Sequence, residues 1–174
     1  MASKSPPLLL AAGILSAPEY TIRRQMLRAT WLSVASSPIL FRFVIRMGGL
    51  PTLAPLSLSL SREQRVYGDV VGVRSVKWNE TRQRGPILSL VAWLRHAARR
   101  LPHARFIAKL DDDVYLHSPS VRQLLDVVGT TRGVNVDRVY MGFLTWSGAT
   151  PRSLSCTRTW CRLPSSSSSS TADC

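Results

Sequence analysis

The sequence predicts an α/β fold in which a parallel or mostly parallel sheet is covered by helices on both faces. Three observations lead to this prediction. The chain has 174 residues, 45% of them hydrophobic, which is enough for one domain with a core. Apolar runs of strand length alternate with segments of helical periodicity. The first of these runs is apolar throughout, which is typical of a strand buried on both faces, as in parallel sheets.

The first half of the chain contains three predicted strands and two predicted helices. The run LLLAAGIL (residues 8–15) is the first strand, and Ser16 with Glu19 forms a capping-box pattern at the start of a helix. Apolar residues then recur at helical spacing with arginines between them: Ile22, Met26, Leu27, Trp31 and Val34. The next predicted elements are a second strand (39–47), a loop and a helix that carries Glu63 (48–66), and a third strand (69–73).

The second half continues this alternation. Its strongest helical pattern is GPILSLVAWLRHAARRL (85–101), with Pro86 in the first turn. The recurring apolar positions of this pattern are Ile87, Leu90, Val91, Leu94, Ala98 and Leu101. The last predicted elements are a fourth strand (105–110), a helix (118–129) and a fifth strand (137–144). Ligands bind beyond the carboxyl ends of the strands in such sheets, which directs attention to the residues after the fourth strand.

The domain organisation follows from a change of composition near residue 150. Residues 1–150 are expected to form the folded part, and residues 151–174, with six consecutive serines, are expected to be disordered. The three cysteines lie between residues 156 and 174, which excludes a disulfide framework for the core. No apolar run approaches the roughly 20 residues that a membrane span requires, so we expect no membrane anchor in this chain.

The net charge of +13 comes almost entirely from arginine, because the chain has only three lysines. Arginine forms bidentate bonds with phosphate, so a nucleotide, a nucleic acid or an anionic surface is a plausible partner. The alternative is an arginine-rich composition whose side chains are simply solvated. No zinc finger, RNP signature or helix-turn-helix supports a nucleic-acid-binding protein, so we regard nucleic acid as the less favoured partner.

Three consecutive carboxylates, Asp111, Asp112 and Asp113, follow the fourth predicted strand. Adjacent carboxylates repel one another, and a Mg²⁺ or Mn²⁺ ion would offset that repulsion. Extended geometry places Asp111 and Asp113 on one side, facing one metal, and Asp112 on the other, near a ribose hydroxyl. The alternative is an acidic turn that caps the next helix without a metal. A P-loop and an EF-hand are excluded, because their other motif residues are missing.

Four motifs in order resemble the beta-1,3-galactosyltransferase-like proteins, glycosyltransferase family 31. The segment ILSAPEYTIRRQMLRATW resembles the beginning of that family, and FRFVIRMGG resembles its second strand. Glu63, Tyr67 and Asp69 match a Glu-x-x-x-Tyr-x-Asp element, and AKLDDDVYLH is similar to the Lys-x-Asp-Asp-Asp-Val signature. The resemblance covers residues 14–117, and the ordered set is more specific than the carboxylate triplet alone.

The resemblance implies a GT-A-like, Rossmann-related fold whose nucleotide-sugar-binding part is residues 1–150. It implies a metal-assisted hexosyltransferase of the Golgi lumen that transfers a sugar with inversion from a UDP-sugar to a glycan or glycoprotein hydroxyl. Asp111 and Asp113 would flank the Mn²⁺ (or Mg²⁺), and Asp112 would lie near the donor. Arg24, Arg28 and Asp69 would also bind the donor. We interpret Arg23 as a solvated helix residue, Trp31 as a core residue and Thr30 as structural.

The sequence also departs from the family pattern. Gly85 and Pro86 occupy the approximate place of the lysine in the family's Leu-Thr-x-Lys element. The acidic and aromatic residues of its preceding Asp-Phe-x-Asp-x-Tyr-like segment are replaced by Arg74, Ser75, Lys77 and Trp78, which leaves the donor sugar open. The family places its catalytic base in a later acidic segment, and no candidate base follows His117 here, so we expect a truncated member whose acceptor half is missing. A non-catalytic fragment therefore remains an alternative to an active enzyme. Asn79 begins an N-glycosylation sequon, usable in the secretory pathway.

Overall fold

The computed structural model describes residues 8–35, 38–131, 139–140 and 161–162 of the chain. It divides into two compact units, residues 1–123 and residues 124–174. The first unit contains β1 (Leu10–Ser16), α1 (Thr21–Ala29), β2 (Ile39–Gly48), α2 (Pro55–Tyr67), β3 (Val70–Lys77), α3 (Arg84–Arg100) and β4 (Phe106–Asp111). Helix α4 (Ser118–Thr130) begins in the first unit and ends in the second.

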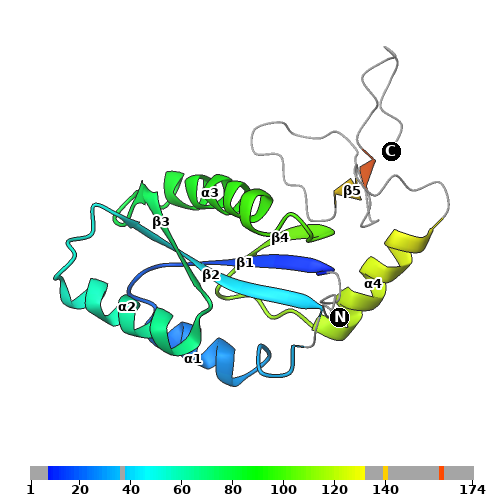
Figure 1. The fold of residues 1–174 in the computed structure, drawn as a ribbon, viewed down its shortest axis with the longest axis horizontal. Coiled ribbons are helices and arrows are strands. Elements are labelled where there is room, and N and C mark those ends of the chain that lie inside the picture. Colours follow the sequence, from blue (N-terminus) through cyan, green and yellow to red (C-terminus); the bar gives the residue numbers. More distant parts are fainter. Residues whose placement is uncertain (1–7, 36–37, 132–138, 141–160, 163–174) are drawn as a thin grey trace, which may run out of the picture. The chain divides into compact units, whose positions relative to one another are not determined.

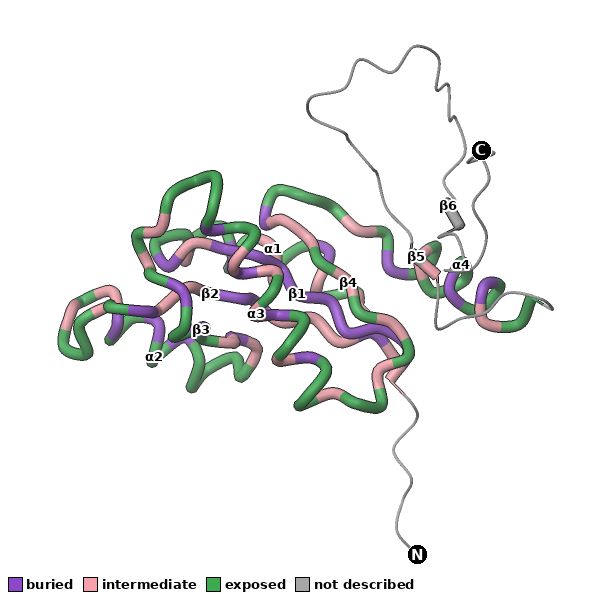
Figure 2. Tube along the Cα trace, turned by 90° about the horizontal axis from the view of Figure 1, so that it is seen from above, coloured by how far each residue is buried: buried purple, intermediate pink, exposed green. Residues whose placement is uncertain are grey.

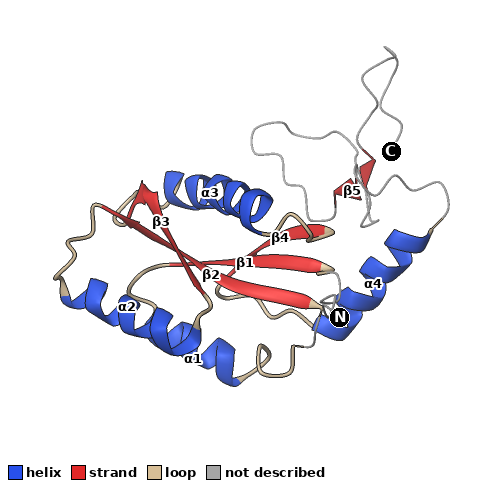
Figure 3. Cartoon of the chain, in the orientation of Figure 1, coloured by secondary structure: helices blue, strands red, loops and turns tan. Residues whose placement is uncertain are grey.

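The first unit is built on a four-stranded sheet with the strand order β3-β2-β1-β4 (Figure 1). All three strand pairs are parallel, and Ile14 of β1 lies in register with Phe43 of β2 and Leu110 of β4. Helices α1 and α2 cover one face and α3 covers the other (Figure 3). The predicted α/β class and the parallel sheet are confirmed, and both are consistent with a GT-A-like fold.

Strands β1 and β2 form the middle of the core, and β1 is buried along its whole length (Figure 2). On one face Ile14, Phe43 and Ile45 pack with Trp31 and with Leu60 of α2. The other face packs against α3 through the side chains of Ala11, Leu15, Val44, Val73, Trp93 and Ala97. Because both faces are covered, these strands lack the alternation of apolar and polar residues that marks a half-exposed sheet.

The capping box predicted for α1 is wrong. Ser16 is the last residue of β1, and α1 begins at Thr21 with Tyr20 as its N-cap. The Ser16 hydroxyl accepts a hydrogen bond from the Arg24 guanidinium over 3.2 Å. The strand therefore extends one residue further than its apolar run, because a buried cation satisfies the polar side chain at its end.

In α1 and α3, the buried face of the helix is not the one that the apolar periodicity predicts. Ile22 and Met26 of α1 are 75% and 62% exposed, whereas Arg24 between them is fully buried. In α3 the predicted positions Ile87, Val91 and Leu94 are exposed, and the buried residues are Gly85, Ser89, Trp93 and Ala97. Trp93 determines the rotation of α3, since its indole N–H donates to the carbonyl of Ala108 in β4 (2.9 Å).

The second unit contains the end of α4, β5 (Val139–Tyr140) and β6 (Cys161–Arg162). Strand β5 pairs with β6 in an antiparallel two-stranded sheet. The predicted fifth strand thus does not extend the parallel sheet, because its described backbone pairs instead with residues 161–162. The remainder of the predicted disordered tail lies outside the described residues. In the described part of the chain, no helix has the length and hydrophobicity needed to cross a bilayer.

Candidate functional site

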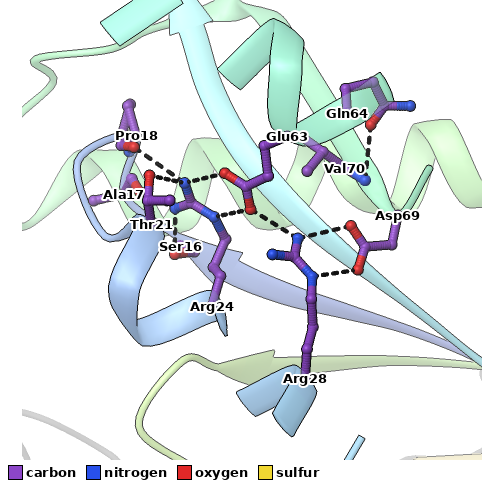
Figure 4. A network of polar contacts seen from close by, with 10 residues as sticks. All are labelled: Ser16, Ala17, Pro18, Thr21, Arg24, Arg28, Glu63, Gln64, Asp69 and Val70. Carbon is purple, nitrogen blue, oxygen red and sulfur yellow. Dashed lines mark hydrogen bonds and ion pairs between the residues drawn. The ribbon is translucent and has the colours of Figure 1, made fainter. Parts of the chain in front are cut away.

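A buried ion-pair network joins the turn after β1 to helix α2 (Figure 4). The Arg24 side chain has no exposed surface, and its Nε and Nη2 atoms donate to the two carboxylate oxygens of Glu63 over 2.8 and 2.7 Å. Its Nη1 donates to the carbonyl of Ala17 (2.6 Å), and Nη2 also reaches the carbonyl of Pro18 (3.2 Å). Arg24 therefore closes the turn between β1 and α1 by binding its carbonyl groups and by pairing with a buried carboxylate.

Arg28 extends this network to the beginning of β3. Its Nε and Nη2 atoms form a bidentate pair with Asp69, both at 2.8 Å, and Nη2 also donates to Glu63 over 2.7 Å. The guanidinium lies between two aromatic rings, 4.0 Å from the centroid of Tyr67 and 4.7 Å from that of Phe43. This arrangement combines charge-assisted hydrogen bonds with cation–π contacts, so Arg28 ties α1 to α2 and β3.

The network fixes the charge of Glu63. Burial alone would raise the pKa of this carboxyl, but the hydrogen bonds from Arg24 and Arg28 outweigh burial and hold the pKa below its usual value. Burial likewise opposes the charged form of Arg28, and its hydrogen bonds to Asp69 and Glu63 nevertheless raise its pKa. Glu63 and Arg28 are therefore ionised at neutral pH, which is the state that their hydrogen bonds require.

The resemblance assigned Arg24, Arg28 and Asp69 to the donor, and the structure brings these residues together with Glu63 rather than around an open cavity. Arg24 offers no exposed atom to a ligand. Arg28 and Asp69 bind each other through both carboxylate oxygens. Of these motif residues, Arg24 binds the backbone of the β1–α1 turn directly, and Arg28 and Asp69 are connected to it through Glu63.

A hollow of about 720 Å³ lies beside this turn, at the carboxyl ends of β1 and β4. One face of α1, together with the residues just before and after the helix, forms one wall, and the turn after β4 forms the other. Its charged lining residues are Glu19, Arg23, Asp112 and Asp113, and its aromatic lining residues are Tyr20, Trp31 and Tyr115. The position agrees with the expectation that ligands bind beyond the carboxyl ends of parallel strands.

The three aspartates differ in their surroundings. Asp111 ends β4 and forms an ion pair with Lys109, two residues earlier on the strand. Asp112 is only 7% exposed, and its Oδ1 accepts a hydrogen bond from Arg23 Nη1 over 2.9 Å. The other oxygen of Asp112, Oδ2, is buried and has no hydrogen-bond partner. Asp113 is exposed and lies on the wall of the hollow.

The extended geometry assumed for the triplet does not continue through it, and the assignment of Asp111 and Asp113 to a metal stays a prediction. We expected Asp111 and Asp113 on one side, but Asp112 and Asp113 line the hollow and Asp111 does not. The reason is that β4 ends at Asp111 and the chain enters a turn, closed by a hydrogen bond from Val114 N–H to the Asp111 carbonyl (3.3 Å). The alternation of side chains does not continue beyond the end of the strand.

Arg23 is exposed, as the sequence indicated, but its contact with the aspartate turn was not predicted. We interpreted it as a solvated helix residue, yet its guanidinium binds Asp112 and lies 4.6 Å from the ring centroid of Tyr20. Its hydrogen bond to Asp112 raises its pKa. A usable signal was its place beside Arg24: neighbouring helical residues point about 100° apart, so if one arginine is buried the other faces a different surface. Trp31, by contrast, is confirmed as a core residue, and Thr30 bonds the carbonyl of Met26.

The residues beside the hollow fit a hard divalent cation in part. Within the described residues, no cluster of three or more His, Cys, Asp or Glu side chains has the spacing of a metal site. However, the unpartnered Oδ2 of Asp112 and the exposed carboxylate of Asp113 are oxygen ligands, which Mg²⁺ and Mn²⁺ prefer. Magnesium is commonly held by one or two carboxylates together with substrate phosphates and water, and two carboxylates are available here.

Comparison with known proteins agrees with the motifs. A family model described as Galactosyltransferase matches residues 22–168. The human acetylgalactosaminyl-O-glycosyl-glycoprotein beta-1,3-N-acetylglucosaminyltransferase is 35% identical over 68% of this chain and 31% of its own length. The beta-1,3-galactosyltransferase GALT1 of Arabidopsis thaliana is 31% identical over 74% of this chain and 19% of its own length.

A third relative, the mouse UDP-GlcNAc:betaGal beta-1,3-N-acetylglucosaminyltransferase 8, is 33% identical over 74% of this chain and 31% of its own length. The chain thus spans about a third or less of these relatives. The family match includes Arg23, Arg24, Arg28, Glu63, Asp69 and the aspartate turn, whereas residues 16–21, which complete the network and the hollow, precede the matched region. The chain belongs to the galactosyltransferase family.

Proposed function

We propose that this chain is the donor-binding part of a hexosyltransferase that uses a nucleotide sugar, UDP-galactose or a UDP-N-acetylhexosamine. The enzyme transfers the sugar with inversion to a hydroxyl of a glycan or glycoprotein acceptor. One observation carries this proposal: a hollow at the carboxyl end of a parallel sheet is lined by Asp112, whose Oδ2 is buried and unpartnered, and by the exposed Asp113. The printed names of the relatives, which are beta-1,3-galactosyl- and N-acetylglucosaminyltransferases, support the same reaction class.

A Mn²⁺ or Mg²⁺ ion belongs to this proposal. Asp112 and Asp113 would hold it, and Asp111, paired with Lys109, remains the more distant member of the predicted set. Such an ion, when bound, neutralises negative charge on a diphosphate leaving group.

The chain's own residues bind and orient the donor. Arg23 presents a cationic, partly exposed side chain to the hollow, which suits the phosphates of a nucleotide. The guanidinium lies over the ring of Tyr20, which is itself partly exposed. Arg24, Arg28 and Asp69 contribute by keeping the β1–α1 turn rigid, so that Arg23 and Tyr20 stay in position before the ligand binds.

Calorimetric titration with UDP, in the presence and absence of Mn²⁺, tests the proposal. We expect Mn²⁺-dependent binding that Asp113→Asn weakens at least tenfold, because the variant removes an exposed carboxylate from the hollow. Glu80→Gln is the matched control, since it also removes one carboxylate but does not line the hollow. Absence of UDP binding by the wild-type chain would overturn the proposal, as would equal effects of the two substitutions.

Binding without turnover is the second candidate function. It is favoured by the residues after His117, among which we find no candidate catalytic base. A donor-hydrolysis or transfer assay with this chain separates the two candidates, because both predict UDP binding and only the first predicts turnover. The acting enzyme would work on the lumenal side of the Golgi membrane, as part of the same proposal.

A further inference from the structure

Helix α3 carries an apolar stripe on the side that points away from the sheet. Ile87, Val91 and Leu94 lie along this stripe and are 64%, 39% and 42% exposed. Ala98, one turn further, is exposed as well. The opposite side of the helix, which includes Trp93, packs against the sheet. The described part of the chain therefore leaves the apolar stripe uncovered.

A row of arginines lies beside the apolar stripe. Arg84, Arg95 and Arg99 are exposed, and a rotation of about 100° per residue places all three next to the stripe. They form no ion pair with any residue that the structure describes. Residues 81–110 contain no aspartate or glutamate, so the helix and the turns beside it supply no counter-charge. The outer side of α3 is thus both apolar and positively charged.

We propose that the outer side of α3 docks on an anionic lipid surface. In this arrangement the helix lies parallel to the surface, the apolar stripe enters the headgroup boundary, and the arginines bind lipid phosphates. Interfacial helices of this kind combine an exposed apolar face with a basic one. Arginine forms bidentate bonds with phosphate, and each basic residue near an anionic leaflet adds to the attraction. The proposal does not depend on the proposed function, because no residue of α3 lines the hollow.

Charge and chemistry favour a lipid surface over three other occupants. A second copy of the chain would bring two arginine rows together, since each copy has a net charge of +13. The residues outside the described ranges contain only Asp137 and Asp173 as acidic residues, so they supply little counter-charge. A nucleic acid or another soluble polyanion would contact the arginines and leave the apolar stripe in water. A lipid surface takes up both kinds of side chain at once.

Docking through α3 would leave the hollow accessible. Helix α3 covers one face of the sheet, and α1, which lines the hollow, covers the other (Figure 3). A lipid surface bound to α3 would therefore hold the chain at a membrane without contacting the residues that line the hollow.

Cosedimentation of the full chain with lipid vesicles tests the proposal. The probes are vesicles of phosphatidylcholine, with and without about 30% phosphatidylserine. The variant Arg95→Gln/Arg99→Gln removes two charges from the row, and Val91→Ser/Leu94→Ser removes the middle of the stripe. We expect wild type to bind the anionic vesicles at least about tenfold more tightly than the neutral ones. Each double variant should lose roughly tenfold or more of that affinity.

Two double variants of α2 are the matched controls. Arg62→Gln/Arg65→Gln and Leu58→Ser/Val66→Ser change exposed residues of the same kinds on the opposite face of the sheet. We expect each control to change the affinity by less than about threefold, because these residues lie away from the docked side. Thermal unfolding of all four variants should match that of wild type, since every substituted residue is exposed.

The proposal is overturned if wild type binds neither kind of vesicle, or binds both equally well. It also fails if the α2 variants weaken binding as much as the α3 variants, because the attraction would then come from net charge alone. A loss in the arginine variant of α3 without a loss in its apolar variant points to a soluble polyanion, such as a nucleic acid or an acidic glycan, and likewise contradicts docking on lipid. Failure of the proposed function is recognised separately, by the absence of UDP binding to the wild-type chain.

Discussion

Arg23 and Arg24 are consecutive in sequence and have opposite environments. Arg24 is fully buried and is bound by a carboxylate, two hydroxyls and two carbonyls, whereas Arg23 is partly exposed and faces the hollow. Their difference follows from the rotation of about 100° per residue along a helix. One arginine therefore shapes the turn after β1, and its neighbour places a positive charge beside the aspartates.

The first prediction concerns Glu63, which pairs with both buried arginines. Glu63→Gln keeps the shape of the side chain and removes its charge, so Arg24 is left as a buried cation without a counter-ion. Breaking such a pair by changing one partner typically costs about 3–5 kcal/mol. We expect a loss of this size in the free energy of unfolding, measured by urea denaturation. Glu19→Gln, at an exposed position, should change it by less than about 0.5 kcal/mol.

The second prediction concerns the effect of pH on the same pair. Because the folded state lowers the pKa of Glu63, this carboxylate stabilises the protein fully above the pKa of an unfolded glutamate, about 4.3. That contribution is lost as the pH falls through the lower pKa of the folded state. Wild type should therefore lose more stability than Glu63→Gln between about pH 5 and pH 2. Parallel curves for the two proteins would contradict this explanation.

The sequence predicts a site at the carboxylate turn, and it did not indicate that Arg23 contacts this turn. Adjacent acidic residues after an apolar strand are a local pattern, so Asp112 and Asp113 could be predicted as site residues. Which of Arg23 and Arg24 is buried depends on which side of α1 meets the sheet. That side is determined by packing against β2 and α2. The direction of the Asp111 side chain relative to Asp113 could not be predicted, because the end of β4 cannot be located to one residue from the sequence.

At the scale of elements, the strands and helices of the first unit were predictable. The buried faces of α1 and α3 were not. Apolar periodicity predicts a buried face only where polar side chains point to solvent, and α1 violates this because Arg24 has a carboxylate partner in the core. In α3 the rotation is set by Trp93, the largest fully buried side chain of the unit. A single large ring outweighs several smaller apolar residues, so Ile87, Val91 and Leu94 face outward.

The third prediction tests the contact between β1 and α3. A methyl group at Gly13 would lie 2.5 Å from the Trp93 ring, which is fully buried and anchored to Ala108 by its indole N–H. We expect Gly13→Ala to lower the free energy of unfolding by about 1–3 kcal/mol, because the ring has no free space to move into. Urea denaturation monitored by tryptophan fluorescence measures the loss.

Gly72→Ala on β3 is the matched control for this contact. Its new methyl group would also lie 2.5 Å from a side chain, but the atom concerned is the sulfur of Met47. A methionine thioether is flexible and can rotate away, and alanine has a higher strand propensity than glycine. We expect Gly72→Ala to change stability by less than about 1 kcal/mol. Equal losses in the two variants would show that α3 does not depend on the Gly13–Trp93 contact.

At the scale of the whole molecule, the charge of +13 invites a nucleic-acid-binding interpretation, and the fourth prediction tests it. Arg23, Arg24 and Arg28 are balanced by Asp112, Glu63 and Asp69, so the excess charge lies on the remaining residues, and the sequence carries no recognised nucleic-acid-binding motif. We therefore expect only non-specific affinity for RNA or duplex DNA, with dissociation constants of about 10⁻⁶ to 10⁻⁴ M at physiological salt, measured by fluorescence anisotropy. A constant below about 10⁻⁸ M would favour the nucleic-acid interpretation instead.

The fifth prediction concerns the compartment in which the molecule folds. Asn79 begins an Asn-Glu-Thr sequon and lies exposed in the turn after β3, away from the residues that line the hollow. If the chain is directed into the secretory pathway of cultured human cells by an added signal peptide, we expect Asn79 to be glycosylated. The product should migrate more slowly on a denaturing gel, and peptide-N-glycosidase should remove the difference.

Asn79→Gln should abolish the shift, whereas Asn135→Gln, outside any sequon, should keep it. A secreted, folded chain without a glycan would contradict the exposure of this turn, and it would also remove one support for a lumenal place of action.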